Sequence, residues 1–180
     1  MDAVANDWDL LTLAPNDRCA VVQLFERHRH YVYRIAWGLL NDDHAADDVV
    51  QDVFLKMQSG RLKARRQAKF TTWLYQVALN TAREQARKRR KFWGDAAAAD
   101  ALKAVPDGQA DPVRIDRLMD LGQALAVLPI RQREVVLLRF FEGFDTAETA
   151  EILGCRTGTV KAHLHRATLK LRDLLGNQAT

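Results

Sequence analysis

Apolar residues recur at steps of three and four along most of the chain, and few segments alternate with period two. Residues 18–40 form a long amphipathic pattern of this kind, and a second one runs over about 44–57. A third occupies 71–91, and residues 143–172 hold two shorter helical patterns joined by a tight glycine turn. The periodicity therefore predicts an all-α protein.

The pattern over 143–172 is typical of a helix-turn-helix. Asp145 and Glu148 have the spacing of a capping box at the start of its first helix. Gly154 suits the left-handed residue that ends this helix, and Thr157 can cap the next one. The second helix has one apolar stripe, made of Val160, Leu164, Ala167 and Leu171.

The other sides of this second helix are basic and polar. Arg156 and Thr159 lie at the end that usually enters the major groove, and Lys161, His163 and Arg166 lie off the apolar stripe. This arrangement predicts contact with double-stranded DNA. An ordinary helical hairpin with a solvated basic face is the alternative.

The least regular stretch divides the 180-residue chain into two small helical domains. Residues 94–112 are rich in Ala, Asp, Pro and Gly and predict a flexible linker. The first domain is then expected over 18–93 and the second, with the helix-turn-helix, over 113–180. Residues 1–17 are expected to form a loosely held leader.

Charge is distributed unevenly between these segments, although the net charge is only +4. Residues 1–60 hold five Lys or Arg against ten Asp or Glu, a net of −5. Residues 61–93 hold eleven against one, a net of +10. An acidic segment followed by a concentrated basic one indicates two different partner surfaces.

The acidic segment includes one face of the helix predicted over 44–57. That face contains Asp47, Asp48, Gln51 and Asp52, opposite the apolar residues Val49, Val53 and Phe54. The face is suited to docking on a basic partner protein. A solvated acidic face without a partner is the simpler alternative.

The helix predicted over 71–91 presents a polar stripe with an aromatic residue. The stripe consists of Trp73, Gln76, Asn80, Arg83, Arg87 and Arg90. Arginines neutralise phosphate, aromatic rings stack on exposed bases, and amides bind base edges, so the stripe predicts nucleic-acid contact. The alternatives are a basic helix end that opposes its own dipole and, for Trp73, a place in the core.

Several other functions are disfavoured. His28 and His30 are two residues apart, as are His163 and His165, so neither pair shares a helix face and we expect no metal site. No cofactor motif occurs, and we expect no enzymatic activity. The isolated Cys19 and Cys155 fit a reducing cytoplasm, and neither a signal peptide nor a membrane span is expected.

Three motifs in order resemble the extracytoplasmic-function (group IV) sigma factors of bacterial RNA polymerase. They are D-D-V-V-Q-D-V-F, T-W-L-x-x-x-A-x-N and G-T-V-K-x-x-L-x-R-A, and the resemblance covers roughly residues 18–175. It implies a two-domain transcription initiation factor without enzymatic activity. The first domain would bind the clamp helices of the polymerase beta-prime subunit and melt the minus-ten promoter element. The second would read the minus-thirty-five element and touch the beta flap, and an anti-sigma factor is a common further partner.

The resemblance also implies roles for individual residues. Asp48, Gln51 and Asp52 match the polymerase-docking stretch, and Asn80 matches the asparagine associated with the melted minus-ten strand. The side of the recognition helix that contacts the minus-thirty-five element is matched by Arg156, Thr159, Lys161, His163 and Arg166.

The sequence departs from the family pattern at two places. The loop SGRLKARRQAK before T-W-L is strongly basic, and Thr149 replaces a usual apolar residue, which is expected to loosen the helix-turn-helix. A two-domain helix-turn-helix regulator without sigma activity is the alternative function. Such a regulator normally needs a dimerisation seam or ligand pocket, and the sequence indicates neither.

Overall fold

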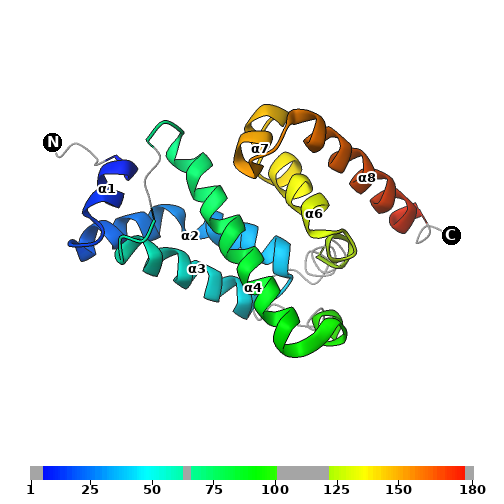
Figure 1. The fold of residues 1–180 in the computed structure, drawn as a ribbon, viewed down its shortest axis with the longest axis horizontal. Coiled ribbons are helices and arrows are strands. Elements are labelled where there is room, and N and C mark those ends of the chain that lie inside the picture. The colour runs from blue at the N-terminus through cyan, green and yellow to red at the C-terminus, as the bar shows by residue number, and fades with distance from the viewer. Residues whose placement is uncertain (1–5, 63–65, 101–121, 177–180) are drawn as a thin grey trace, which may run out of the picture.

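The computed structural model describes residues 6–62, 66–100 and 122–176 (Figure 1). Helices account for its regular structure, and no strand occurs in these ranges, so the all-α prediction is confirmed. Residues 122–126 are also helical. The labelled elements are α1 (Asp7–Leu13), α2 (Arg18–Leu40), α3 (Asp43–Gln58), α4 (Phe70–Asp100), α6 (Ile130–Val136), the π-helical turn η2 (Leu137–Phe141), α7 (Thr146–Leu153) and α8 (Thr157–Gly176).

Helices α2 and α3 meet at a sharp corner that local polar residues create. Asn41 ends α2 in the left-handed conformation (φ 49°), and Asp42 caps α3 by accepting a hydrogen bond from the Ala45 amide at 2.8 Å. The other Asp42 oxygen accepts one from Arg89 Nη2 at 2.7 Å. Burial alone would raise the pKa of Asp42, but these two contacts lower it below its ordinary value.

Helix α1 corrects the expectation of a loosely held leader. Asn6 caps this helix through the Trp8 amide, and the side chains of Trp8, Leu10 and Leu11 are buried in the core. Asp7 also binds Arg27 Nη1 at 2.8 Å and the ring of the buried His28 at 2.9 Å. The cap and the apolar residues were visible in the sequence, but the short helix gains its stability from packing on α2.

Helix α4 extends beyond the C-terminal end of the predicted first domain. It continues to Asp100, seven residues into the stretch 94–112 that was expected to be a linker. Residues 101–112 of that stretch lie outside the described part of the chain. Alanine and the other good helix formers after Arg90 favour this extension, and the composition alone did not distinguish it from a linker.

The helix-turn-helix forms as predicted. Asp145 and Glu148 make both hydrogen bonds of the capping box, and Gly154 ends α7 in the left-handed conformation (φ 63°). Thr157, which was predicted to cap the second helix, is instead the first residue of α8. Thr149 does not loosen the packing, because it is fully buried and its hydroxyl donates to the Asp145 carbonyl at 2.7 Å.

The two domains pack against each other along α4, which lies between the helices of the first domain and α6 and α7 (Figure 1). One apolar core extends from α1 through α4 into the second domain, where it includes Leu125, Leu138 and Ile152. At the junction, Gly38 of α2 lies so close to Leu137 that a Cβ atom there would be 2.5 Å from Leu137 Cδ2. A small residue at position 38 therefore permits the two domains to meet.

Candidate nucleic-acid and polymerase interfaces

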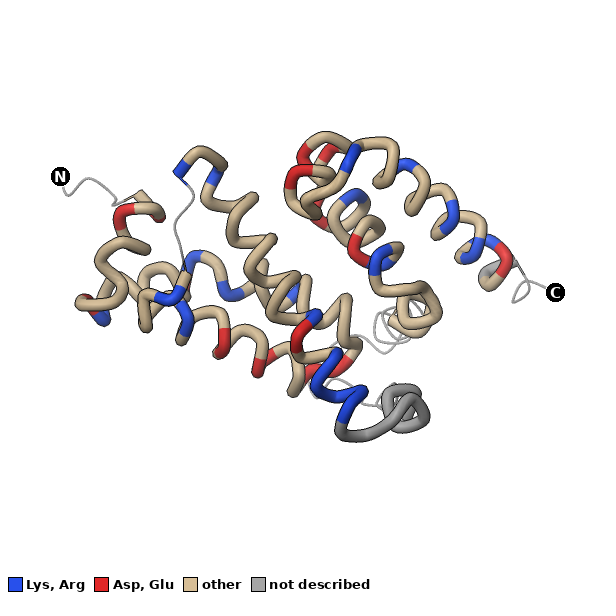
Figure 2. The backbone as a smooth tube through the Cα atoms, in the orientation of Figure 1, with Lys and Arg blue, Asp and Glu red and all other residues tan. Residues whose placement is uncertain are grey.

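The start of α8 presents the polar residues predicted to read DNA. Val160 and Ala167 are buried against α6 and α7, which turns the opposite side of the helix to solvent. Arg156, Thr159, Lys161 and Arg166 are exposed. Lys and Arg residues recur along the length of α8 (Figure 2), and the exposed ones place positive charge on its solvent side.

His163 differs from its neighbours on α8. Its side chain is half-buried, and its Nδ1 atom is enclosed without a hydrogen-bond partner within the described residues. The ring lies at the edge between the buried and the solvent side of the helix. Its contribution to the predicted DNA surface is therefore smaller than that of Lys161.

The polar face of α3 is accessible, as docking on a partner requires. Asp48 and Gln51 are exposed, and Asp52 is half-buried because it accepts a hydrogen bond from Gln85 Nε2 at 3.1 Å. Leu55, one turn further along the helix, is 59% exposed. The face thus combines negative charge with an accessible apolar side chain.

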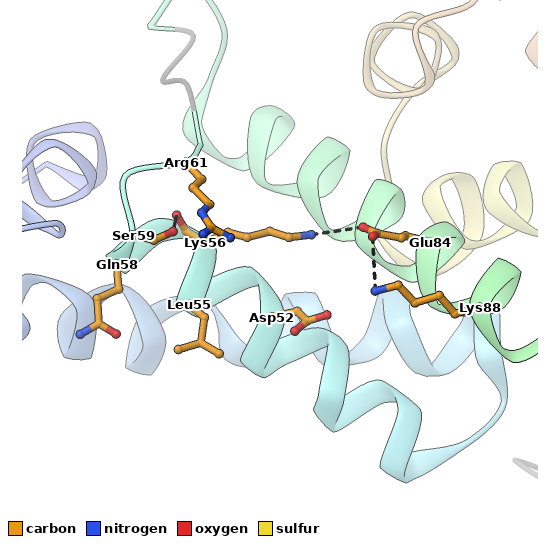
Figure 3. Close-up of a pocket in the computed structure, with 8 residues that line it drawn as sticks. All are labelled: Asp52, Leu55, Lys56, Gln58, Ser59, Arg61, Glu84 and Lys88. Carbon is orange, nitrogen blue, oxygen red and sulfur yellow. Dashed lines mark hydrogen bonds and ion pairs between the residues drawn. The ribbon is translucent and has the colours of Figure 1, made fainter.

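A surface hollow of about 590 Å³ lies beside this face, between α3 and α4 (Figure 3). In the hollow, Lys56 reaches from α3 toward Glu84 of α4, with 3.6 Å between Nζ and Oε2. Lys88 approaches the other Glu84 oxygen at 3.3 Å, and the hydrogen bond from Lys88 and the charge of Lys56 lower the pKa of Glu84. Glu84 therefore binds two of the cations beside the predicted docking face.

The structure corrects the prediction for Trp73. Its side chain is only 4% exposed, and its ring packs on those of Trp8 and Phe70 at centroid distances of 5.4 and 5.3 Å. Helix α1 supplies the covering ring, and the sequence pattern of α4 alone did not reveal it. Trp73 is therefore a core residue, and its ring is not accessible for stacking on bases.

Three other residues of the predicted stripe on α4, Gln76, Asn80 and Arg83, lie along the boundary with the second domain. Arg83 binds the Glu134 carboxylate with two hydrogen bonds, 2.5 Å from Nε and 2.8 Å from Nη2. Arg83 also donates to the side-chain oxygen of the exposed Asn80 at 2.7 Å, and Gln76 donates to the Glu151 carbonyl at 3.0 Å. Arg87 is exposed beyond this contact.

A second carboxylate of the second domain, Glu142 in the segment between η2 and α7, binds two residues of the first domain. Arg34 donates to it from Nε and Nη2 at 2.9 and 2.6 Å, and the Tyr75 hydroxyl donates to the same carboxylate. Burial, followed by the hydrogen bond to Glu142, raises the pKa of Tyr75. The contact with Glu142 raises the pKa of Arg34 although burial opposes it.

Sequence reasoning missed Glu134 and Glu142 as functional residues. The side chain of Glu134 is fully buried and that of Glu142 is 3% exposed. The available signal was the pair of carboxylates that flank the mostly apolar run 135–141, because carboxylates are rarely buried without a partner. The sequence could not show that the partners of these carboxylates are Arg83, Arg34 and Tyr75 of the first domain.

Within 6–62, 66–100 and 122–176, no three His, Cys, Asp or Glu side chains are grouped so that they could hold a metal ion. None of the described helices is long and apolar enough to cross a membrane.

Comparison with known proteins gives two family matches that follow the two domains. Residues 24–92 match Sigma-70 region 2, and residues 118–171 match Sigma-70, region 4. The chain is 31% identical to the ECF RNA polymerase sigma factor SigM of Mycobacterium tuberculosis over 160 residues, which cover 89% of the chain and 79% of SigM. It is 30% identical to the RNA polymerase sigma factor SigV of Bacillus subtilis over 155 residues, which cover 86% of the chain and 90% of SigV.

A solved structure has a similar arrangement. The sigma factor RpoE of Bartonella quintana, crystallised with the anti-sigma factor NepR, superposes with a TM-score of 0.67 at 26% sequence identity. The match covers 86% of the chain and 96% of RpoE.

Proposed function

Because this chain belongs to the extracytoplasmic-function group of the sigma-70 family, whose members direct RNA polymerase to promoters, we propose a division of that work among its helices. Helix α3 docks on core polymerase, α4 contacts the melted minus-ten strand, and α8 reads the minus-thirty-five element. The proposal rests chiefly on α8, whose apolar stripe is buried while Arg156, Thr159 and Lys161 face solvent at the end suited to a groove.

Docking through α3 is supported by its accessible polar face. Asp48 and Gln51 are exposed and have no side-chain hydrogen bond or ion pair within the described residues, and Leu55 offers an apolar contact beside them. Such a face suits the beta-prime clamp helices if these present basic residues, since complementary charge accelerates and orients association. The beta flap is the proposed partner of the second domain.

Contact of α4 with the minus-ten strand is proposed for Gln76, Asn80, Arg83 and Arg87. Amides can bind the edges of unstacked bases, and arginines can bind the strand's phosphates. Trp73 is not included, since it is buried. No catalytic residue is assigned, and we propose that the protein acts in the cytoplasm as an initiation factor without enzymatic activity of its own.

An anti-sigma factor is a further proposed partner, because RpoE of Bartonella quintana was solved in complex with one. A suitable surface is the apolar hollow of about 230 Å³ between α2 and η2. Trp37, Gly38, Leu137 and Phe141 contribute to its walls. Beside it, Phe140 is 67% exposed.

Run-off transcription with purified core polymerase tests the function directly. The full-length chain should confer promoter-specific initiation on core polymerase, and mapping the start sites should yield paired minus-ten and minus-thirty-five elements. A regulator without sigma activity would bind DNA alone and leave core polymerase unable to initiate. The latter result would reject the proposed function.

A further inference from the structure

The boundary between the two domains covers the same face of α4 that is proposed to contact the minus-ten strand. Arg83 and Gln76 bind groups of the second domain directly, and the oxygen of Asn80 is taken by Arg83. At the exposed rim, Lys69 lies 3.6 Å from Glu148. Within the stripe, Arg83 is therefore occupied by a carboxylate of α6 and Gln76 by a carbonyl oxygen of α7, while Asn80 and Arg87 are exposed.

The groups that occupy the face imitate the chemistry of a nucleic-acid strand. An arginine guanidinium binds carboxylate and phosphate through the same pair of parallel hydrogen bonds, and Glu134 forms that pair with Arg83. Arg83 cannot make the same bonds to a phosphate while it holds Glu134. The second domain and a nucleic-acid strand thus require the same donors.

The burial of these carboxylates shows that the contact is more than an incidental surface contact. Glu134 is completely buried, and Glu142 is held by Arg34 and Tyr75 at the same boundary. The ring of Tyr75 also packs edge-on against Phe144 at a centroid distance of 4.9 Å, and Leu137 fills the space above Gly38. Apolar packing and paired charges therefore act together on one surface.

We propose that the second domain is an intramolecular competitor of the minus-ten strand, with Glu134 as the group that takes the place of a DNA phosphate on Arg83. This inference rests on the proposed role of α4. In the free protein the two domains are closed on each other, and the α4 face becomes available only when they separate. Binding to core polymerase, which must hold the domains at two separate promoter elements, would favour the separated form.

The junction at Gly38 offers a way to open the domains without changing a proposed DNA or polymerase contact. Replacing Gly38 by Ala would place a Cβ atom against the mobile end of Leu137, which can partly yield. Replacing it by Leu adds a larger, branched side chain that must displace Leu137 from the junction. Helix α2 itself should tolerate both changes, since both residues are better helix formers than glycine.

The first measurement is the distance between the domains in the free protein. One fluorophore is placed on the exposed Cys19 and the other on a cysteine introduced by His165→Cys, in a Cys155→Ser background. The wild-type interface should give one population of high energy transfer. Gly38→Leu and, independently, Glu142→Gln should shift it to low transfer, with Gly38→Ala intermediate and Glu26→Gln unchanged.

The second measurement is the affinity of the same proteins for a single-stranded minus-ten oligonucleotide. If closure hides the binding face, apparent affinity rises in proportion to the open fraction, so Gly38→Leu should bind about tenfold more tightly. Low transfer in the wild-type protein, or opening in Gly38→Leu without tighter binding, would overturn the proposal.

Run-off transcription distinguishes this failure from a failure of the proposed function. Wild-type holoenzyme could initiate normally while the opened variants bind the oligonucleotide no more tightly than the wild-type protein. That result would reject only the proposed competition between the second domain and the minus-ten strand. Absence of initiation by wild-type holoenzyme rejects the function, and with it the competition. Circular dichroism of each variant shows whether its helices are intact.

Discussion

Trp73 and Asn80 belong to one sequence motif, but Trp73 is buried and Asn80 is exposed. Replacing Trp73 should therefore mainly lower stability, and replacing Asn80 should mainly impair promoter opening. Trp73→Ala removes a ring packed on Trp8 and Phe70 and should lower the free energy of unfolding by about 3–5 kcal/mol. Asn80→Ala removes an exposed side chain and should change it by less than about 0.5 kcal/mol while impairing promoter opening. Urea unfolding and permanganate footprinting measure the two effects. Wild-type stability in Trp73→Ala would contradict the assignment to the core.

Tyr75 should make the stability of the free protein sensitive to alkaline pH. Its folded-state pKa lies above its ordinary value of about 10, so the folded state retains the proton that the unfolded chain loses. The stabilisation is fully present below pH 10 and declines as the pH rises above it, by up to about 1.4 kcal/mol per pH unit. Tyr75→Phe should remove this decline.

The comparison of Tyr75→Phe with the wild-type protein by urea unfolding between pH 8 and 11 isolates this residue. Tyr33, whose pKa is raised by burial and by its hydrogen bond to Asp43, contributes equally to both proteins. Arg133, whose pKa is lowered by burial, also contributes equally to both proteins. Identical pH dependence in the two proteins would show that Tyr75 does not hold its proton against Glu142.

At the scale of an element, α3 should bind polymerase through its exposed residues. Asp48→Arg with Gln51→Ala reverses charge on a solvent-facing side and should weaken binding to core polymerase at least about tenfold without altering the fold. These residues suit the test better than Asp52, which holds Gln85. The control is Glu26→Arg, a charge reversal at an exposed position of α2. Equal affinities of both variants in a core-binding assay would exclude α3 as the docking element.

Along α8, specificity and affinity should separate by position. Arg156 directly precedes α8, at the end of the helix that is proposed to enter the major groove. Arg156→Ala should relax preference at particular minus-thirty-five bases by about 1–3 kcal/mol. Arg166→Ala, further along, should weaken all promoters equally and reduce the salt dependence by about one phosphate contact. Holoenzyme binding to a promoter panel at several salt concentrations measures both. The reverse pattern would mean that α8 lies in the groove in the opposite orientation.

Helices whose ends are marked by capping residues or glycine were predictable from the sequence. Helices that are stabilised mainly by packing against distant residues were not. The capping box at Asp145 and the glycine at 154 specify α7 and its turn within a few residues of chain. By contrast, α1 has only seven residues, and its burial depends on Phe70 and Trp73. The same dependence led to the wrong prediction for Trp73, because helical periodicity identifies a stripe without showing what covers it.

For the whole molecule, the sequence predicted two domains but not their contact. The pairs that join them are 51 residues apart for Arg83 and Glu134 and 108 apart for Arg34 and Glu142. No periodicity or motif spacing relates residues at such separations. Physical complementarity is evident only once the fold brings the charges together.

The shared core predicts that the closed protein unfolds as one unit. Because apolar packing and buried ion pairs extend across the boundary, calorimetry of the wild-type protein should give one transition with equal calorimetric and van't Hoff enthalpies. Gly38→Leu should split this transition into two, since each domain would then unfold by itself. Two transitions in the wild-type protein would indicate that the boundary contributes little to stability.

The order of the two domains along the chain has a consequence during synthesis. Helices α1 to α4 emerge from the ribosome before α6 and α7, and about 80 residues separate the end of α4 from the end of α8. At 5–20 residues per second this interval lasts roughly 4–16 s. The nascent first domain therefore emerges with its α4 face uncovered, and the second domain can cover that face only seconds later.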